Sequence, residues 1–226
     1  MARIEQPSDG HGSLKNIQIL VNEKTELIDS MLRIKFPDMA NDSIIWKSPL
    51  KSDNYAEYLD DDFIEKIGLE KKEINLLDFW PKGGAHWDAL ATTTSDKIIL
   101  VEAKANIPEI VTSKSGAGEI SKKLILKSLE ETKSYLGIKN DIDWSGKFYQ
   151  YTNRLAHLYF LRVICDKPAY LINIYFLNDI SVNGPESERE WRAALQVMYS
   201  YFGISRHKLN KYMSNIFIDV NELNRK

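Results

Sequence analysis

The chain has little cysteine and no long apolar run, and each scarcity excludes a class of protein. Cys165 is the only cysteine among 226 residues, so no disulfide can form within the chain. The longest apolar stretch, Ala169 to Leu177, is interrupted by Asn173 and is far too short to span a bilayer. Met1 to Gly12 lacks the apolar segment of a signal peptide. We therefore expect a cytoplasmic protein that does not enter a membrane.

An excess of charge of one sign is also absent. The chain has 30 Lys and Arg against 32 Asp and Glu, and 43% of its residues are hydrophobic. This composition excludes disordered and collagen-like proteins and argues against a strongly basic protein that wraps nucleic acid, although it leaves room for a local basic patch. At this length we predict one domain over residues 13–226, preceded by a flexible tail over residues 1–12.

Periodicity, caps and breakers predict an alternation of helices and strands along the chain. Helices are predicted over Ser13–Phe36, Asn54–Ile67, Glu119–Leu136 and Ser145–Cys165, and from the capping box at Ser187 to Gly203. Extended segments are predicted over Ser43–Leu50, Leu76–Trp80, Ala85–Thr94, Lys97–Ala105, Ala169–Leu177 and Asn215–Val220. The strand Lys97–Ala105 has apolar residues on both faces, which is typical of a central strand covered on both sides. The order favours an α/β fold with a central mixed sheet flanked by helices.

Polar residues gather at the ends of two neighbouring strands. His86 and Asp88 share one face of the first, and Glu102 and Lys104 share one face of the second, because side chains alternate along a strand. A hairpin about residues 94–96 brings Asp88 within one residue of Glu102. Two carboxylates held together repel each other unless a cation lies between them. Oxygen ligands without cysteine indicate Mg²⁺ or Mn²⁺, and Lys104 adds a positive charge suited to a nucleophilic water or a phosphate. The pattern indicates metal-assisted phosphodiester hydrolysis.

These residues also resemble a known family. The segments Gly83-Gly84-Ala85-His86-Trp87-Asp88-Ala89-Leu90 and Ile98-Ile99-Leu100-Val101-Glu102-Ala103-Lys104 are similar to the motif of the PD-(D/E)XK, or restriction-endonuclease-like, nucleases. The motif covers about 25 residues, and Trp87 stands where the motif's name has proline. The resemblance implies a restriction-endonuclease-like fold, with Asp88 and Glu102 as metal ligands, Lys104 as the catalytic lysine and the backbone carbonyl of Ala103 as a further ligand.

In that family a glutamate of the first helix often completes the site. The helical wheel of Ser13–Phe36 places Glu23 at the border of the apolar face, whereas Glu26 points to water. We therefore expect Glu23 to be the additional catalytic and metal-binding carboxylate. The alternative is that Glu23 and Glu26 are both solvated residues on the helix surface.

Four further residues are candidates for substrate binding. His86 lies on the Asp88 face and can line the site, or it can be a strand histidine satisfied by the backbone. Gln150 and Arg154 share one side of the predicted helix from Ser145, and the family resemblance implies contacts of such a helix with phosphates. Lys114 lies in the glycine-containing loop 113–118, which could follow a phosphate backbone. The alternative for these helix and loop residues is an ordinary solvated surface.

We expect a Mg²⁺-dependent nuclease that acts on DNA, with RNA as the other substrate and with both endonuclease and exonuclease action left open. Two alternatives remain. One is a nucleic-acid-binding module on the same fold without turnover, which the isoelectric point near 6.1 favours slightly; the other is a hydrolase of a small phosphorylated substrate. A cutter of duplex DNA with one active site per chain often works as a homodimer.

Overall fold

A central sheet of five strands organises the computed structural model, which describes residues 3–70 and 74–225. Its strands are β2 (Ile44–Ser48), β4 (Ala89–Thr93), β5 (Ile98–Lys104), β6 (Ala169–Leu177) and β7 (Met213–Asp219), in the spatial order β2-β4-β5-β6-β7. The pairs β2–β4 and β4–β5 are antiparallel, and the pairs β5–β6 and β6–β7 are parallel. The expected α/β fold with a mixed sheet flanked by helices is therefore confirmed.

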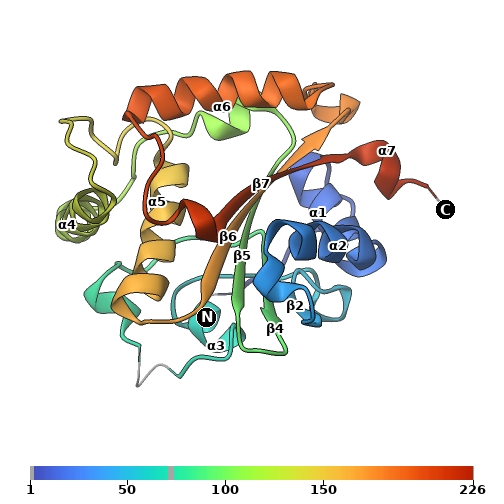
Figure 1. Cartoon of the computed structure of the whole chain (residues 1–226), viewed down its shortest axis with the longest axis horizontal. Helices are drawn as coiled ribbons and strands as arrows, with labels where there is room; N and C mark the ends of the chain where they lie inside the picture. The colour runs from blue at the N-terminus through green and yellow to red at the C-terminus, as the bar shows by residue number, and fades with distance from the viewer. Residues whose placement is uncertain (1–2, 71–73, 226) are drawn as a thin grey trace.

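Helices cover both faces of this sheet (Figure 1). One layer consists of α1 (Gly12–Glu23), α2 (Thr25–Lys35) and the short α7 (Val220–Leu223); the other consists of α3 (Asp60–Lys66), α4 (Glu119–Leu136), α5 (Tyr149–Tyr159) and α6 (Glu188–Phe202). Alternate residues of β5 serve the two cores: Val101 and Ala103 pack with α1, whereas Ile98 and Leu100 pack with α5. We call these two sides the α1 face and the α5 face. By the same alternation, Glu102 and Lys104 belong to the α5 face.

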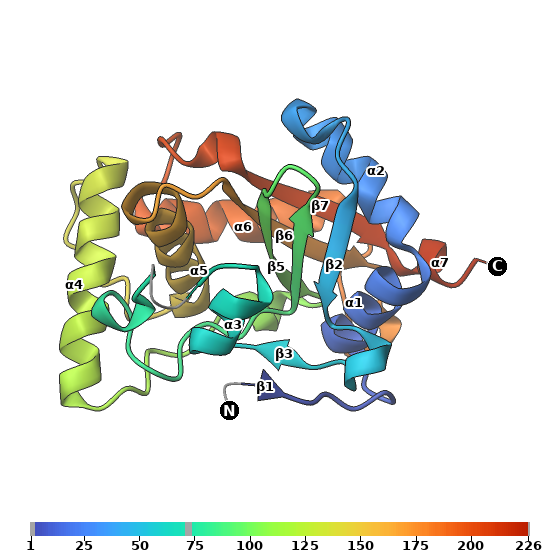
Figure 2. The same ribbon diagram turned by 90° about the horizontal axis from the view of Figure 1, so that it is seen from below.

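A second, two-stranded sheet lies beside the main one (Figure 2). It pairs β1 (Arg3–Ile4) with β3 (Glu57–Tyr58), and Tyr58 forms an isolated antiparallel bridge with Trp87. Residues 3–4 fall within the segment that we expected to be a tail, and they are paired; residues 1–2 of that segment lie outside the described part. The small sheet thus links the start of the chain to the residues that precede β4.

Several short turns of helix complete the chain. The 3₁₀ turns are Pro37–Met39, Lys51–Asp53, Leu76–Asp78, Ile107–Ile110, Ile180–Val182 and Asn210–Tyr212, and a π turn, Phe160–Ile164, follows α5. In residues 3–70 and 74–225, no helix is both long and apolar enough to cross a membrane.

Some expected elements differ from those observed. The helix expected over Ser13–Phe36 is broken at Lys24, where the backbone leaves the helical region (φ −131°, ψ 33°). The helix expected over Asn54–Ile67 is reduced to α3, because Glu57 and Tyr58 pair with β1 instead. Residues 76–78 form a 3₁₀ turn rather than a strand. The last two expected helical regions differ less: α5 begins only after Phe148, which has a φ of 59°, and α6 begins at Glu188. The predicted cap, Ser187, precedes α6, and its side chain accepts from the backbone N–H of Glu190.

Candidate functional site

The hairpin of β4 and β5 brings Asp88 to Glu102. Ala89 pairs with Val101 and Leu90 with Leu100, so Asp88, immediately before β4, comes opposite Glu102. Asp88 Oδ2 accepts a hydrogen bond from the backbone N–H of Ala103 at 2.6 Å. The carboxylate therefore takes the place of a backbone acceptor where β4 has ended, and this contact fixes its position at the edge of β5.

Glu102 is held by two cations on the α5 face. Arg154 of α5 donates from Nε to Glu102 Oε2 at 2.6 Å, and the Lys104 ammonium contacts Glu102 Oε1. The side chains of Glu102 and Arg154 are only 7% and 4% exposed, so the pair is buried. Burial opposes ionisation of Glu102, but the charges of Arg154 and Lys104 outweigh it and lower the pKa of Glu102. Glu102 is therefore an ionised carboxylate at neutral pH.

Arg154 is fixed by more than its ion pair. Its Nη2 donates to the backbone carbonyl of His86 at 2.5 Å, and its guanidinium carbon lies 5.0 Å from the ring centroid of Trp87. Arg154 therefore connects α5, β5 and the segment before β4. These contacts make it a buried structural cation, where the sequence predicted a contact with a nucleic-acid backbone.

A third carboxylate, Glu57, joins the group from β3. The antiparallel bridge between Tyr58 and Trp87 places Glu57 beside Asp88. Glu57 is buried, and burial together with the charge of Glu102 raises its pKa to about 7. Burial and the charges of Glu102 and Glu57 raise the pKa of Asp88 to about 8. We refer to Glu57, Asp88, Glu102, Lys104 and Arg154 as the acid cluster.

The acid cluster has three carboxylates and two basic groups. Lys104 and Arg154 both contact Glu102, and the raised pKa values show that Asp88 and Glu57 are poorly compensated. Burial opposes the charge of Lys104, but Glu102 and Asp88 outweigh it and raise its pKa. A further cation near Asp88 and Glu57 would lower both raised pKa values and stabilise the ionised forms.

The donor atoms suit a hard divalent cation, although they are not all free to bind one. Within residues 3–70 and 74–225, no group of three or more His, Cys, Asp and Glu side chains is arranged to hold a metal ion. Both Glu102 oxygens are engaged by Arg154 and Lys104. Asp88 and Glu57 supply carboxylate oxygens, and the carbonyl of Ala103 faces the same strand edge as its N–H, which is the Asp88 side. Mg²⁺ or Mn²⁺ thus fits this donor chemistry once Glu102 exchanges a basic partner for the ion.

Glu23 lies outside the acid cluster. It is the exposed last residue of α1, whose residues Ile17 and Leu20 pack on the α1 face of the sheet. Glu102 projects from the opposite face, so the sheet separates the two carboxylates. The expectation that Glu23 completes the site is therefore wrong, because the helical wheel gave its angle to the apolar stripe but not the face of the sheet that α1 covers.

The other substrate-binding candidates lie at different distances from the acid cluster. Gln150, in the first turn of α5, lines a small cavity of about 20 Å³ together with Glu102 and Lys104. His86 is half-buried and lines a larger cavity bordered by Gly84 and the loop 115–118, and burial lowers its pKa. Lys114 is exposed in the adjoining loop. Gln150 therefore borders the acid cluster, His86 contacts it through the backbone carbonyl that accepts from Arg154, and Lys114 lies on the surface.

Glu57 is the residue that sequence reasoning missed. It falls in a segment expected to be helical, and it reaches Asp88 only because β3 pairs with residues far away in the chain. No spacing within residues 54–67 signals this pairing.

Comparisons with known proteins give no relative for this chain. No family model matches it, and neither does any curated protein or solved structure. The functional argument therefore depends on the geometry of the acid cluster.

Proposed function

We propose that the chain is a metal-dependent nuclease that hydrolyses phosphodiester bonds in DNA, on a restriction-endonuclease-like fold. The observation that carries the proposal is the position of Asp88, at the edge of β5 directly beside the Glu102-Ala103-Lys104 segment. The helical layers and the mixed sheet are compatible with that fold. Glu57 takes the role that we had expected for Glu23.

The acid cluster supplies what hydrolysis of a phosphodiester requires. Asp88, Glu57, Glu102 and the carbonyl of Ala103 would hold Mg²⁺ or Mn²⁺, which would supply Lewis-acid activation of the phosphate and of a water. A divalent cation bound beside Asp88, whose pKa is about 8, would favour the ionised carboxylate. The Lys104 ammonium, which contacts Glu102 Oε1, would orient the attacking water and offset the charge that develops on the phosphate.

One observation favours a second candidate function. Arg154 and Lys104 occupy both oxygens of Glu102, and the cavity beside them holds about 20 Å³, roughly the space of one water. In a nucleic-acid-binding module without turnover, Arg154 and Lys104 would stay bound to Glu102 at all times. In a nuclease, Arg154 or Lys104 must release one oxygen before cleavage.

A divalent-metal titration followed by a cleavage assay tests the proposal. The protein is titrated with Mg²⁺, Mn²⁺ and Ca²⁺ by calorimetry and then incubated with supercoiled, linear and single-stranded DNA and with RNA. Metal binding and metal-dependent cleavage in the wild type, both lost in Asp88→Asn, support the nuclease. Nucleic-acid binding without cleavage under any metal supports the binding module, and cleavage of RNA alone would contradict DNA as the substrate.

A further inference from the structure

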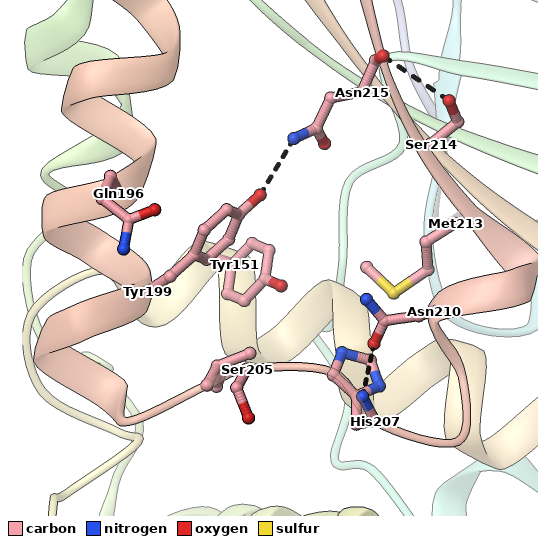
Figure 3. A pocket seen from close by; sticks show the side chains of 10 residues that line it. Tyr151, Gln196, Tyr199, Ser205, His207, Asn210, Met213, Ser214 and Asn215 are labelled. Carbon is pink, nitrogen blue, oxygen red and sulfur yellow. Dashed lines mark hydrogen bonds between the residues drawn. The ribbon is translucent and has the colours of Figure 1, made fainter.

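A cavity of about 460 Å³ lies between the C-terminal part of α6, the loop after it and the edge strand β7 (Figure 3). Tyr151 and Tyr199 form part of its wall, with ring centroids 5.7 Å apart. The amides of Gln196, Asn210 and Asn215 also line it. The acid cluster uses none of these side chains. We call this space the tyrosine cavity.

The tyrosine cavity is polar but uncharged. Among the described residues that line it, no side chain is acidic or carries the charge of Lys or Arg. Burial lowers the pKa of His207 to about 4, so this ring is neutral at pH 7. A phosphate or a carboxylate would find no counter-charge here. A neutral planar group with hydrogen-bonding edges would find two aromatic rings and several amides.

Side chains at matching positions on three neighbouring strands lead from this cavity to the acid cluster. Glu102, Asn173 and Asn215 occupy matching positions on β5, β6 and β7. Asn173 Nδ2 donates to Asn215 Oδ1 at 3.2 Å, and Asn215 Nδ2 donates to the Tyr199 hydroxyl at 2.9 Å. Since neighbouring strands are about 4.8 Å apart, Asn215 lies about 10 Å from Glu102 across the sheet. Tyr151 lines both the tyrosine cavity and the small cavity beside Glu102 and Lys104.

We propose that the tyrosine cavity binds the base of a nucleotide whose phosphate lies at the acid cluster. Bases stack on tyrosine rings and form hydrogen bonds with amide side chains, and an amide can recognise a base edge in two directions. Asn210 uses Oδ1 to accept from the backbone N–H of His207, so its Nδ2 is the donor that it offers to the base. This proposal depends on the nuclease function, because that function is what brings a phosphate to Glu102 and Lys104.

Only a base that is not stacked between its neighbours can occupy the tyrosine cavity. A base inside a duplex cannot enter a cavity at the edge of β7, whereas a base in a single strand or one extruded from a duplex can. The substrate class that fits is therefore single-stranded DNA, or duplex DNA with a locally unpaired base.

The test measures base binding without cleavage. Dissociation constants are determined by fluorescence anisotropy, in EDTA, for a labelled single-stranded DNA oligonucleotide and for an abasic oligonucleotide of the same length. The abasic strand keeps every phosphate, so the difference between the two reports the base alone. The wild type should bind the normal strand about tenfold or more tighter, as expected for stacking of one base.

Matched variants test whether the preference for the normal strand comes from the tyrosine cavity. Ser205→Trp and Gln196→Trp place a large side chain at exposed positions that line the tyrosine cavity, and each should abolish the preference for the normal strand. Ser200→Trp makes the same chemical change as Ser205→Trp at an exposed position on α6 that does not line the cavity, and it should keep the preference. Thermal unfolding of each variant checks that the fold is retained.

The outcomes separate this proposal from the nuclease function. Equal affinity for the two strands, or a preference that survives in both filling variants, overturns the base site even if DNA is cleaved. A preference that the filling variants abolish, without cleavage under any metal, supports base binding and contradicts the nuclease. A free deoxynucleoside that binds as tightly as the strand overturns the strand as the source of the base.

Discussion

Asp88 and Ala103 are joined by a hydrogen bond from a backbone N–H to a carboxylate, with Oδ2 accepting at 2.6 Å. The bond lies where the β4 backbone stops pairing with β5. It fixes the position of a carboxylate whose charge is poorly compensated, beside the Glu102-Ala103-Lys104 segment. An isosteric amide can keep this bond through its carbonyl oxygen, so Asp88→Asn removes the ionisable group and retains the hydrogen bond.

Asp88→Asn should remove metal binding and metal-dependent cleavage while the fold is retained, because the amide keeps the bond to Ala103 but cannot ionise to the carboxylate that a divalent cation needs. Lys104→Met should lower turnover by about 100-fold or more while metal binding survives, since an ammonium cannot ligate a cation. Calorimetry and cleavage assays on both variants measure the two effects. Loss of metal binding in a folded Lys104→Met protein would contradict the assigned role.

Glu57→Gln should weaken metal binding and lower cleavage, and higher metal concentration should partly restore the rate. The physical reason is that Glu57 lies beside Asp88 and is buried. The matched control is Glu23→Gln, an identical change at an exposed residue on the far side of the sheet, which should behave like the wild type. If the Glu23 variant were the impaired one, the assignment of Glu57 would be wrong.

Arg154→Ala should destabilise the protein by about 3–5 kcal/mol, because it removes the partner of Glu102 Oε2 at 2.6 Å and leaves only Lys104 to offset the buried charge. Mg²⁺ should recover part of this loss, since the freed oxygen can bind the ion. Arg192→Ala is the control: Arg192 pairs with Glu188 on an exposed helix surface, and its loss should cost less than about 1 kcal/mol. Urea unfolding with and without Mg²⁺ measures the differences. A loss for Arg154→Ala no larger than that of the control would contradict the buried pair.

Without metal, the free energy of unfolding should fall as pH rises from 6.5 to 8.5. Asp88 and Glu57 have folded-state pKa values of about 8 and about 7, above their ordinary values of 3.8 and 4.5. The folded state therefore binds more protons than the unfolded state in this window, and its advantage is lost as pH rises through the folded pKa values. One such proton corresponds to a slope of about 1.4 kcal/mol per pH unit.

The window above pH 6.5 avoids the opposing effect of histidine. Burial lowers the pKa of His157 to about 4, so His157 favours the folded state progressively less as pH falls below about 6.5. Thermal unfolding in EDTA and in Mg²⁺ provides the measurement. The slope should shrink in Asp88→Asn, and Mg²⁺ should stabilise the protein more at pH 8.5 than at pH 6.5. A free energy of unfolding that does not change with pH in EDTA would show that the pKa values of Asp88 and Glu57 are not raised.

The part of the acid cluster that follows from local rules was predictable from the sequence. A strand alternates its faces, which placed Glu102 and Lys104 together, and the short turn at residues 94–96 set the register that brings Asp88 opposite Glu102. The apolar run before Glu102 identified a buried central strand. These features depend on residues that are neighbours in sequence or across one hairpin.

The other parts depend on contacts between distant segments. Glu57 reaches Asp88 through a strand of two residues that pairs with Arg3 and Ile4, a signal too short for any periodicity. Glu23 was misplaced because a helical wheel does not tell which face of a sheet the helix covers. The break at Lys24 has neither glycine nor proline beside it, so the sequence around it predicts a continuous helix.

The pairing of β1 with β3 couples the start of the chain to the acid cluster. The Gln6 side chain partly offsets the raised pKa of Glu57, and the Gln6 backbone N–H donates to the carbonyl of Asn54 at 3.2 Å. A protease cut between Glu5 and Gly10, or a bulky affinity tag fused ahead of Arg3, would loosen the strand that carries Glu57. The position of a purification tag should therefore affect the acid cluster. Activity should be compared between proteins that carry the tag at one end or at the other.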